Sequence, residues 1–166
     1  MFATGSPAPD VSFLDTSGKE ITAKDLLARR PGVPLLLVFF KVTCPVCKLA
    51  WPYLERLHKQ YGESVQVVGV SQNDSGAASA FYAENGKATF GVIFDPEPRF
   101  RASNAYDVES VPHHVLVGKD GQVSRIFSGW TRTEMDELPR RLVNDREATL
   151  VPVVAFDDPV PAMKPG

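Results

Sequence analysis

The length, composition and charge of the chain exclude several classes of protein. Its 166 residues carry a formal net charge of −2, and 43% of them are hydrophobic and 23% charged. This balance is typical of a globular domain with its own core, and it argues against a surface that binds nucleic acid or an anionic membrane. No apolar run approaches the roughly 20 residues that a membrane-spanning helix needs.

The start of the chain shows neither a basic leader nor an apolar signal core. We therefore predict a cytoplasmic protein, with an extracytoplasmic location as the alternative if a leader has been removed. We expect one domain over residues 1–166, with its core over about residues 6–145 and a proline-rich tail over 150–166. No repeat or linker divides the chain.

The first thirty residues are expected to form a short hairpin and a helix. A strand around Phe13, a turn over 15–19 and a returning strand at Glu20–Ile21 predict the hairpin. Thr22 is a suitable N-cap for the helix that follows. Asp25 falls in the first turn of this helix, where a negative charge is favourable.

A buried strand and a helix then enclose the two cysteines. Residues 35–40 are a continuous apolar run, which favours a strand covered on both faces. After Cys44-Pro45-Val46-Cys47, apolar residues recur at helical spacing until Gly62. The start of a helix favours an anion, so a thiol at Cys44 loses its proton more easily. One helical turn separates Cys44 from Cys47, which is close enough for a disulfide.

Because the chain has only these two cysteines, we predict a redox-active dithiol. A structural disulfide is one alternative, although a bridge across two residues contributes little stability. A metal site is the other alternative. Tetrahedral zinc needs two further ligands, and the candidates are His58, His113 and His114.

The second half of the chain alternates between predicted strands and helices. The predicted strands cover 65–70, 92–94, 115–117 and 123–127. Asp120-Gly121 between the last two is a hairpin signal. Ser75 is the expected N-cap of one helix, and Thr131 with Glu134 forms a predicted capping box for the last one. The tail is expected to lie along the surface or to fray.

This order of elements resembles the thioredoxin superfamily. Pro52, five residues after the second cysteine, matches the helix-bending proline of that family. The opening Pro7-Ala8-Pro9-Asp10, the loop Val70-Ser71-Gln72 and the step Val111-Pro112 resemble its TlpA/ResA branch, which has AhpC/TSA-redoxin-like domains. The resemblance implies an α/β fold of three layers. It has a central mixed sheet with helices on both faces, an N-terminal β-hairpin and a central insertion.

The resemblance also implies a thiol–disulfide oxidoreductase that acts on protein disulfides, as a reductase. Its position at the helix start makes Cys44 the nucleophile, and Cys47, one turn deeper, resolves the mixed disulfide. No cofactor is expected beyond the Cys44–Cys47 disulfide. The expected partners are protein thiol or disulfide substrates and an upstream electron donor, and the expected state is a monomer.

Four further residues complete the predicted site. The resemblance implies a cis bond before Pro112, which leaves the backbone of Val111 free to pair with an extended substrate. Thr43 stands where the family usually has tryptophan, and it is expected to face the substrate. His113 lies either at the rim of the site, where its protonated form would stabilise a thiolate, or in a partly exposed polar contact.

The proton acceptor for Cys47 needs a separate assignment. The family positions for such a group, on the central strand and after the second cysteine, are Val38 and Ala50 here. Asp74, in the loop after the predicted strand 65–70, is therefore the candidate. Capping of the following helix is the alternative role of Asp74.

Two other functions are possible on the same fold. Thiol peroxidases carry Pro-x-x-x-Thr-x-x-Cys, but Leu37 and Lys41 occupy the proline and threonine positions of this pattern. A copper-binding assembly factor would use the two cysteines with His113 or His114, but such proteins usually space their cysteines one residue wider.

Overall fold

A computed structural model describes residues 2–143 and 149–166. Within these ranges a seven-stranded mixed sheet has the strand order β2-β1-β5-β4-β3-β6-β7. Its strands are β1 (Phe13–Leu14), β2 (Glu20–Ile21), β3 (Leu35–Phe40), β4 (Gln66–Ser71), β5 (Gly91–Phe94), β6 (His113–Val117) and β7 (Val123–Ser128). The helices are α1 (Ala23–Arg29), α2 (Pro45–Tyr61), α3 (Ser75–Glu84), α4 (Arg101–Ala105) and α5 (Arg132–Leu142). A second sheet pairs β8 (Trp130–Thr131) with β9 (Met163–Lys164). The predicted core limit at residue 145 lies outside the described residues.

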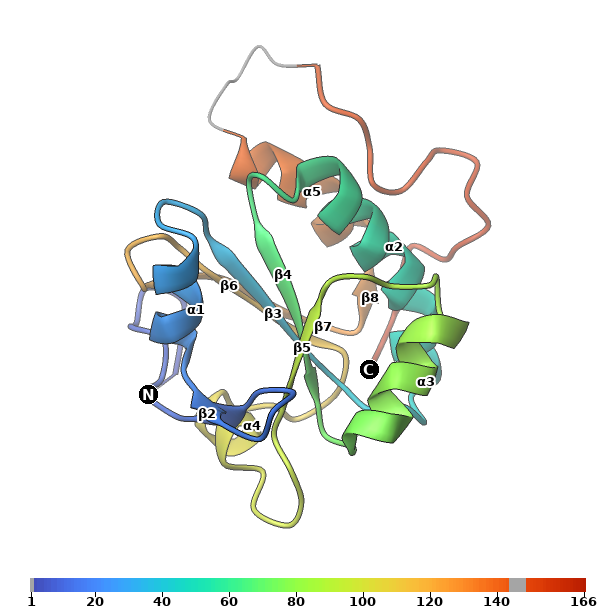
Figure 1. The fold of residues 1–166 in the computed structure, drawn as a ribbon. Helices are drawn as coiled ribbons and strands as arrows, with labels where there is room; N and C mark the ends of the chain where they lie inside the picture. Colours follow the sequence, from blue (N-terminus) through green and yellow to red (C-terminus); the bar gives the residue numbers. More distant parts are fainter. Residues whose placement is uncertain (1, 144–148) are drawn as a thin grey trace.

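The helices cover both faces of the large sheet, with α1 and α4 on one side and α2, α3 and α5 on the other (Figure 1). Every residue of β3 is buried, because this strand lies inside the sheet between β4 and β6 and helices cover both faces. Its side chains alternate between the two faces, as strand geometry requires. The predicted three-layer α/β fold is confirmed.

The core on the α2 face is rich in aromatic rings. The centroid of the Trp51 ring lies 4.2 Å from that of Phe40. The Trp51 ring also contacts the ring of Phe81. Strand β4 approaches this cluster so closely that a Cβ on Gly69 would collide with the hydroxyl of Tyr82. Glycine at this position therefore lets α2 and α3 pack onto the sheet.

Two predicted helix starts match the structure and two differ from it. Thr22 and Asp25 form a capping box at α1, and Cys44 is the N-cap of α2. The prediction that Ser75 caps α3 is wrong: Asp74, one residue earlier, is the N-cap, and its carboxylate accepts the N–H of Ala77. Both residue types are good caps, so the sequence alone did not separate these neighbours.

The predicted capping box of α5 is also wrong. Thr131 is the N-cap, but its side chain makes no capping hydrogen bond. Glu134 pairs with Arg125 of β7 instead of closing back on the start of the helix. The reason is that Thr131 also belongs to β8, where it pairs with Met163.

The tail lies along the surface, as predicted, but it also makes ordered contacts that the sequence did not predict. It passes α2 and ends near β8 (Figure 1). Val153 and Val154 are buried in the α2-side core, and Tyr61 of α2 donates a hydrogen bond to the carbonyl of Val151. Of the helices in the described ranges, none has the length and apolar character needed to span a bilayer.

Candidate active site

The turn between β3 and α2 positions the first cysteine. The N–H of Cys44 donates to the carbonyl of Lys41 at 3.1 Å, and Pro45 begins the helix. Proline suits this position because the first N–H groups of a helix have no partner within it. The backbone of Cys44 is extended, and its Sγ accepts the N–H of Cys47 at 3.2 Å. The sulfur therefore occupies the place of a capping oxygen at the positive end of α2.

The two cysteines have different surroundings. Both are free thiols, but Cys44 is half-buried whereas Cys47 is completely buried. Burial raises the pKa of the Cys47 thiol well above its ordinary value, and a hydrogen bond with Cys44 raises it further. A hydrogen bond with the backbone of Lys41 acts in the opposite direction on the pKa of Cys47. Reagents in solution can therefore reach Cys44, while Cys47 stays protonated and covered.

The segment before β6 completes the site. The thiol of Cys44 donates to the carbonyl oxygen of Val111 at 3.3 Å. The peptide bond between Val111 and Pro112 is cis, and Pro112 is buried while Val111 is half-buried. The structure therefore brings together Cys44, Cys47, Val111 and Pro112.

A neighbouring strand end supports the cysteine turn. The side-chain oxygen of Asn73 accepts the N–H of Val42 at 3.0 Å, and the Asn73 N–H donates to the hydroxyl of Ser71. Asn73 is not among the site residues that the sequence predicts. Parallel strands β3 and β4 end at the same edge of the sheet, and a polar residue just after β4 is the signal that could have identified it.

Thr43 is exposed beside Cys44, and so are Lys41 and Lys48. These three side chains therefore lie where a bound protein could contact them. Exposed polar side chains are ordinarily solvated, so this placement alone assigns them no role.

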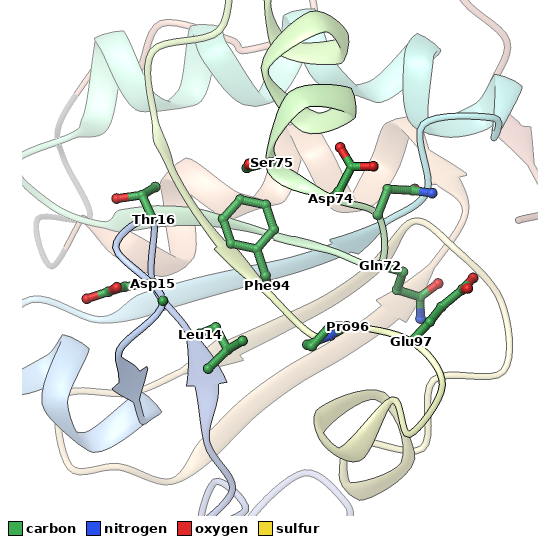
Figure 2. Close-up of a pocket in the computed structure, with 11 residues that line it drawn as sticks. Leu14, Asp15, Thr16, Gln72, Asp74, Ser75, Phe94, Pro96 and Glu97 are labelled. Carbon is green, nitrogen blue, oxygen red and sulfur yellow. The ribbon is translucent and has the colours of Figure 1, made fainter.

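Asp74 lies in the same loop region but in a different environment. Its Oδ1 caps α3, and the residue lines a pocket of about 470 Å³ together with Asp15, Gln72 and Glu97 (Figure 2). Neither cysteine lines this pocket. Among the described contacts, none joins Asp74 to Cys47, so the structure supports capping and leaves the relay role as a prediction.

The adjacent histidines of β6 point to opposite faces of the sheet. His113 pairs in register with Phe39, contacts its ring, and has Nδ1 2.8 Å from the hydroxyl of Ser128. It therefore lies on the α1 face, away from α2. His114 stacks on Phe127, on the α2 face.

Burial lowers the pKa of His113 and lowers that of His114 to about 3. Both rings are therefore neutral at physiological pH, and neither is exposed. The structure does not place His113 at the rim of the dithiol site. Within residues 2–143 and 149–166, no group of three or more histidine, cysteine or acidic side chains is arranged to hold a metal ion.

Comparison with known proteins identifies the family of this chain. A family model for the AhpC/TSA family matches residues 4–126. The chain belongs to this family. The thiol-disulfide oxidoreductase ResA of Bacillus subtilis (strain 168) is 30% identical over 131 residues, covering 78% of this chain and 69% of the relative. ResA of Geobacillus kaustophilus (strain HTA426) is 31% identical over 135 residues, covering 81% and 74%.

Solved structures show the same fold. A protein of Chlorobium tepidum described as a thiol:disulfide interchange protein DsbE superposes with a TM-score of 0.70 at 24% identity, covering 85% of this chain and 96% of the other. The thioredoxin domain of a thiol-disulfide oxidoreductase from Bacteroides vulgatus superposes with a TM-score of 0.66 at 21% identity, covering 78% and 91%. The predicted thioredoxin-like fold and the resemblance to the ResA branch are confirmed.

Proposed function

We propose that this protein is a thiol–disulfide oxidoreductase that reduces protein disulfides with its Cys44–Cys47 dithiol. The observation that carries the proposal is the asymmetry of the pair. Cys44 is accessible at the start of α2, and Cys47 is buried one turn further along. A resolving thiol must wait, unreactive, until the first sulfur has been attacked, and burial of Cys47 provides this order.

In the first step, the thiolate of Cys44 attacks one sulfur of a substrate disulfide. The substrate S–S bond breaks, a mixed disulfide forms at Cys44, and the other substrate sulfur leaves as a thiolate that takes up a proton. The Cys47 N–H, which already donates to Cys44 Sγ, stabilises the attacking thiolate. The carbonyl of Val111, which contacts Cys44 in the free protein, lies where an extended substrate backbone would pair.

In the second step, Cys47 loses its proton and attacks Cys44 Sγ. This releases the second substrate thiol and leaves the Cys44–Cys47 disulfide, so two electrons pass from the dithiol to the substrate. Burial makes loss of the Cys47 proton the difficult part of this step. An upstream dithiol donor must then reduce the disulfide again. We expect the protein to work as a monomer, because one chain supplies both sulfurs of the dithiol.

Trapping of the mixed disulfide tests the proposal. Cys47→Ser should accumulate covalent complexes with a disulfide-containing protein such as insulin, because the resolving sulfur is gone. Cys44→Ser is the matched control and should form none. The complexes are detected by non-reducing electrophoresis and mass spectrometry. Equal trapping by both variants, or trapping by Cys44→Ser alone, would contradict the assigned roles.

Asp74 is proposed as a relay for the Cys47 proton, and one substitution separates this role from capping. Asparagine caps a helix about as well as aspartate. Asp74→Asn should therefore preserve the thermal unfolding midpoint while slowing release of the reduced product near neutral pH. Unchanged release rates with unchanged stability would assign Asp74 to capping alone.

The two alternative functions have their own tests. A thiol peroxidase would consume hydrogen peroxide at the expense of the dithiol, and a copper-binding factor would hold copper(I) stoichiometrically when reduced. The sequence pattern at Leu37 and Lys41 argues against the first function. The placement of the two histidines argues against the second, because His113 lies with Phe39 on the α1 face and His114 stacks on Phe127.

A further inference from the structure

A short segment near the end of the chain lies against the dithiol site. We call residues 161–166 the C-terminal strap. Its central residues form β9 and pair antiparallel with β8, so that Lys164 is opposite Trp130 and Met163 is opposite Thr131. The indole N–H of Trp130 donates to the carbonyl of Pro161 at 2.6 Å. The strap is therefore an added strand that is held through its own main-chain groups.

From β8 the strap continues to the residue that contacts the reactive sulfur. A Cβ placed on Gly166 would lie 2.5 Å from the carbonyl oxygen of Val111 and 3.1 Å from the hydroxyl of Ser110. The same Val111 oxygen accepts the thiol of Cys44 at 3.3 Å. The strap and the reactive sulfur therefore meet at one carbonyl group.

The surface under the strap is continuous with the active site. The N–H of Gly129, just before β8, donates to the carbonyl of Pro112 at 2.8 Å. A Cβ on Gly129 would collide with the carbonyl of Lys164, so glycine at this position lets the strap approach. Trp130, which is buried, packs with its ring 5.0 Å from that of Tyr53 on α2. Gly129 and Trp130 thus form a strand-binding surface that ends at Val111.

The strap is held weakly compared with the rest of the fold. All six of its residues are exposed, and Met163 keeps 64% of its surface in solvent. Outside the β8–β9 pair, the carbonyls of Pro161 and Ala162 accept hydrogen bonds from the indole N–H of Trp130 and from the N–H of Arg132. An extended segment of another protein could offer the same carbonyls, whatever its sequence. Elements with few buried contacts open most readily.

We propose that the surface formed by β8, Gly129 and Val111 binds an extended segment of the protein substrate, and that the strap occupies this surface until the substrate displaces it. This inference rests on the proposed function. The preferred occupant has a glycine or another small residue beside Val111, because a side chain there meets the Val111 carbonyl. The strap competes with protein substrates for this surface. The apparent affinity for a substrate is therefore the intrinsic affinity multiplied by the fraction of molecules in which the strap has left.

Steady-state reduction of insulin, with dithiothreitol as the dithiol donor that regenerates the enzyme, is compared with that of oxidised glutathione to test this proposal. Deleting residues 161–166 should lower KM for insulin about five- to tenfold and leave kcat unchanged, if the strap covers the surface in most molecules. KM for glutathione disulfide should change less than about twofold, because a small disulfide does not need the strand surface. A synthetic peptide with the sequence of residues 160–166 should restore the higher KM as a competitive inhibitor.

Gly166→Val provides a second test that keeps the whole chain. The added side chain cannot fit beside the Val111 carbonyl, so the strap end should lift and KM for insulin should fall in the same direction. Phe156→Ala is the matched control, because Phe156 is 98% exposed in the tail outside the strap. This control should leave both KM values unchanged.

The outcomes of these experiments distinguish failure of the strap proposal from failure of the proposed function. Normal reduction of insulin with an unchanged or higher KM in both strap variants would overturn the strap proposal and leave the proposed function standing. A joint fall of kcat and of the unfolding midpoint in Gly166→Val would assign the strap to structural support and overturn the competition. Absence of exchange with insulin and with glutathione disulfide in every form of the protein would overturn both proposals.

Discussion

The central sheet and the C-terminal strap flank the same reactive sulfur, but they are held by different forces. Strand β3, which leads to Cys44, is buried along its whole length between two other strands. The strap, which ends beside Val111, is exposed at every residue and attached through a two-residue strand pair and a few hydrogen bonds. The rigid side fixes the geometry of the sulfur, and the loosely held side is the one that a substrate can displace.

The largest expected difference between the two regions is in stability. Trp51→Ala should lower the free energy of unfolding by about 3–5 kcal/mol, because it removes a fully buried ring from the aromatic cluster. Met163→Ala in the strap should change it by less than about 0.5 kcal/mol. Urea unfolding followed by circular dichroism measures both values. Similar losses in the two variants would show that the strap is part of the core.

A second prediction uses the buried histidine on the α2 face. His114 has a pKa lowered to about 3 in the fold, against 6.5 when it is unfolded. The unfolded state therefore binds a proton first as the pH falls, and stability present above pH 6.5 is lost toward pH 3. Each pKa unit corresponds to about 1.4 kcal/mol, so the loss reaches a few kcal/mol.

His114→Asn tests this prediction, because the amide can still donate to the carbonyl of Phe127, the partner of His114 Nδ1, but cannot take a charge. Its free energy of unfolding should fall less steeply than that of the wild type between pH 6.5 and about 4, measured by urea titration at several pH values. An identical slope in both proteins would mean that His114 is already accessible to protons.

A third prediction concerns a buried carboxylate in the rigid region. Glu55 of α2 accepts hydrogen bonds from the N–H and the hydroxyl of Thr89. Glu55→Gln keeps an oxygen for the Thr89 N–H but replaces the charged acceptor with a neutral amide, so the loss of charge assistance should cost about 1–2 kcal/mol. Glu63→Gln, at an exposed position, should change stability by less than about 0.5 kcal/mol. Equal unfolding midpoints in urea for the two variants would contradict this account of Glu55.

The smallest expected effect is at the tail's attachment to α2. Asp158 forms an ion pair with Arg56 at 2.7 Å and also accepts the N–H of Ala155. Asp158→Asn should accelerate amide hydrogen exchange in residues 151–160 about two- to threefold and leave the exchange of β3 unchanged. The hydrogen bond from Arg56 lowers the pKa of Asp158, so acidification below this pKa should have the same effect in the wild type. Acceleration that extends to β3 would contradict the separation of the two regions.

The same contrast explains what the sequence could and could not predict. The apolar run of β3 and the spacing of the cysteines predict the strand, the helix start and the dithiol, because these features depend on side chains. The strand pair of β8 and β9 escapes prediction, because the carbonyls of Pro161 and Ala162 hold it and any residue supplies a carbonyl. The face of His113 also escapes, because adjacent strand residues alternate and only the register with Phe39 decides the side.

Competitive alkylation of the two thiols tests the central claim most directly. The reduced protein is treated with a limiting amount of iodoacetamide at neutral pH, and the modified cysteine is identified by peptide mass spectrometry. The account predicts that Cys44 reacts at least about tenfold faster than Cys47, because Cys44 is accessible at the helix start and Cys47 is buried and protonated. Faster modification of Cys47 would contradict the assignment of nucleophile and resolving thiol.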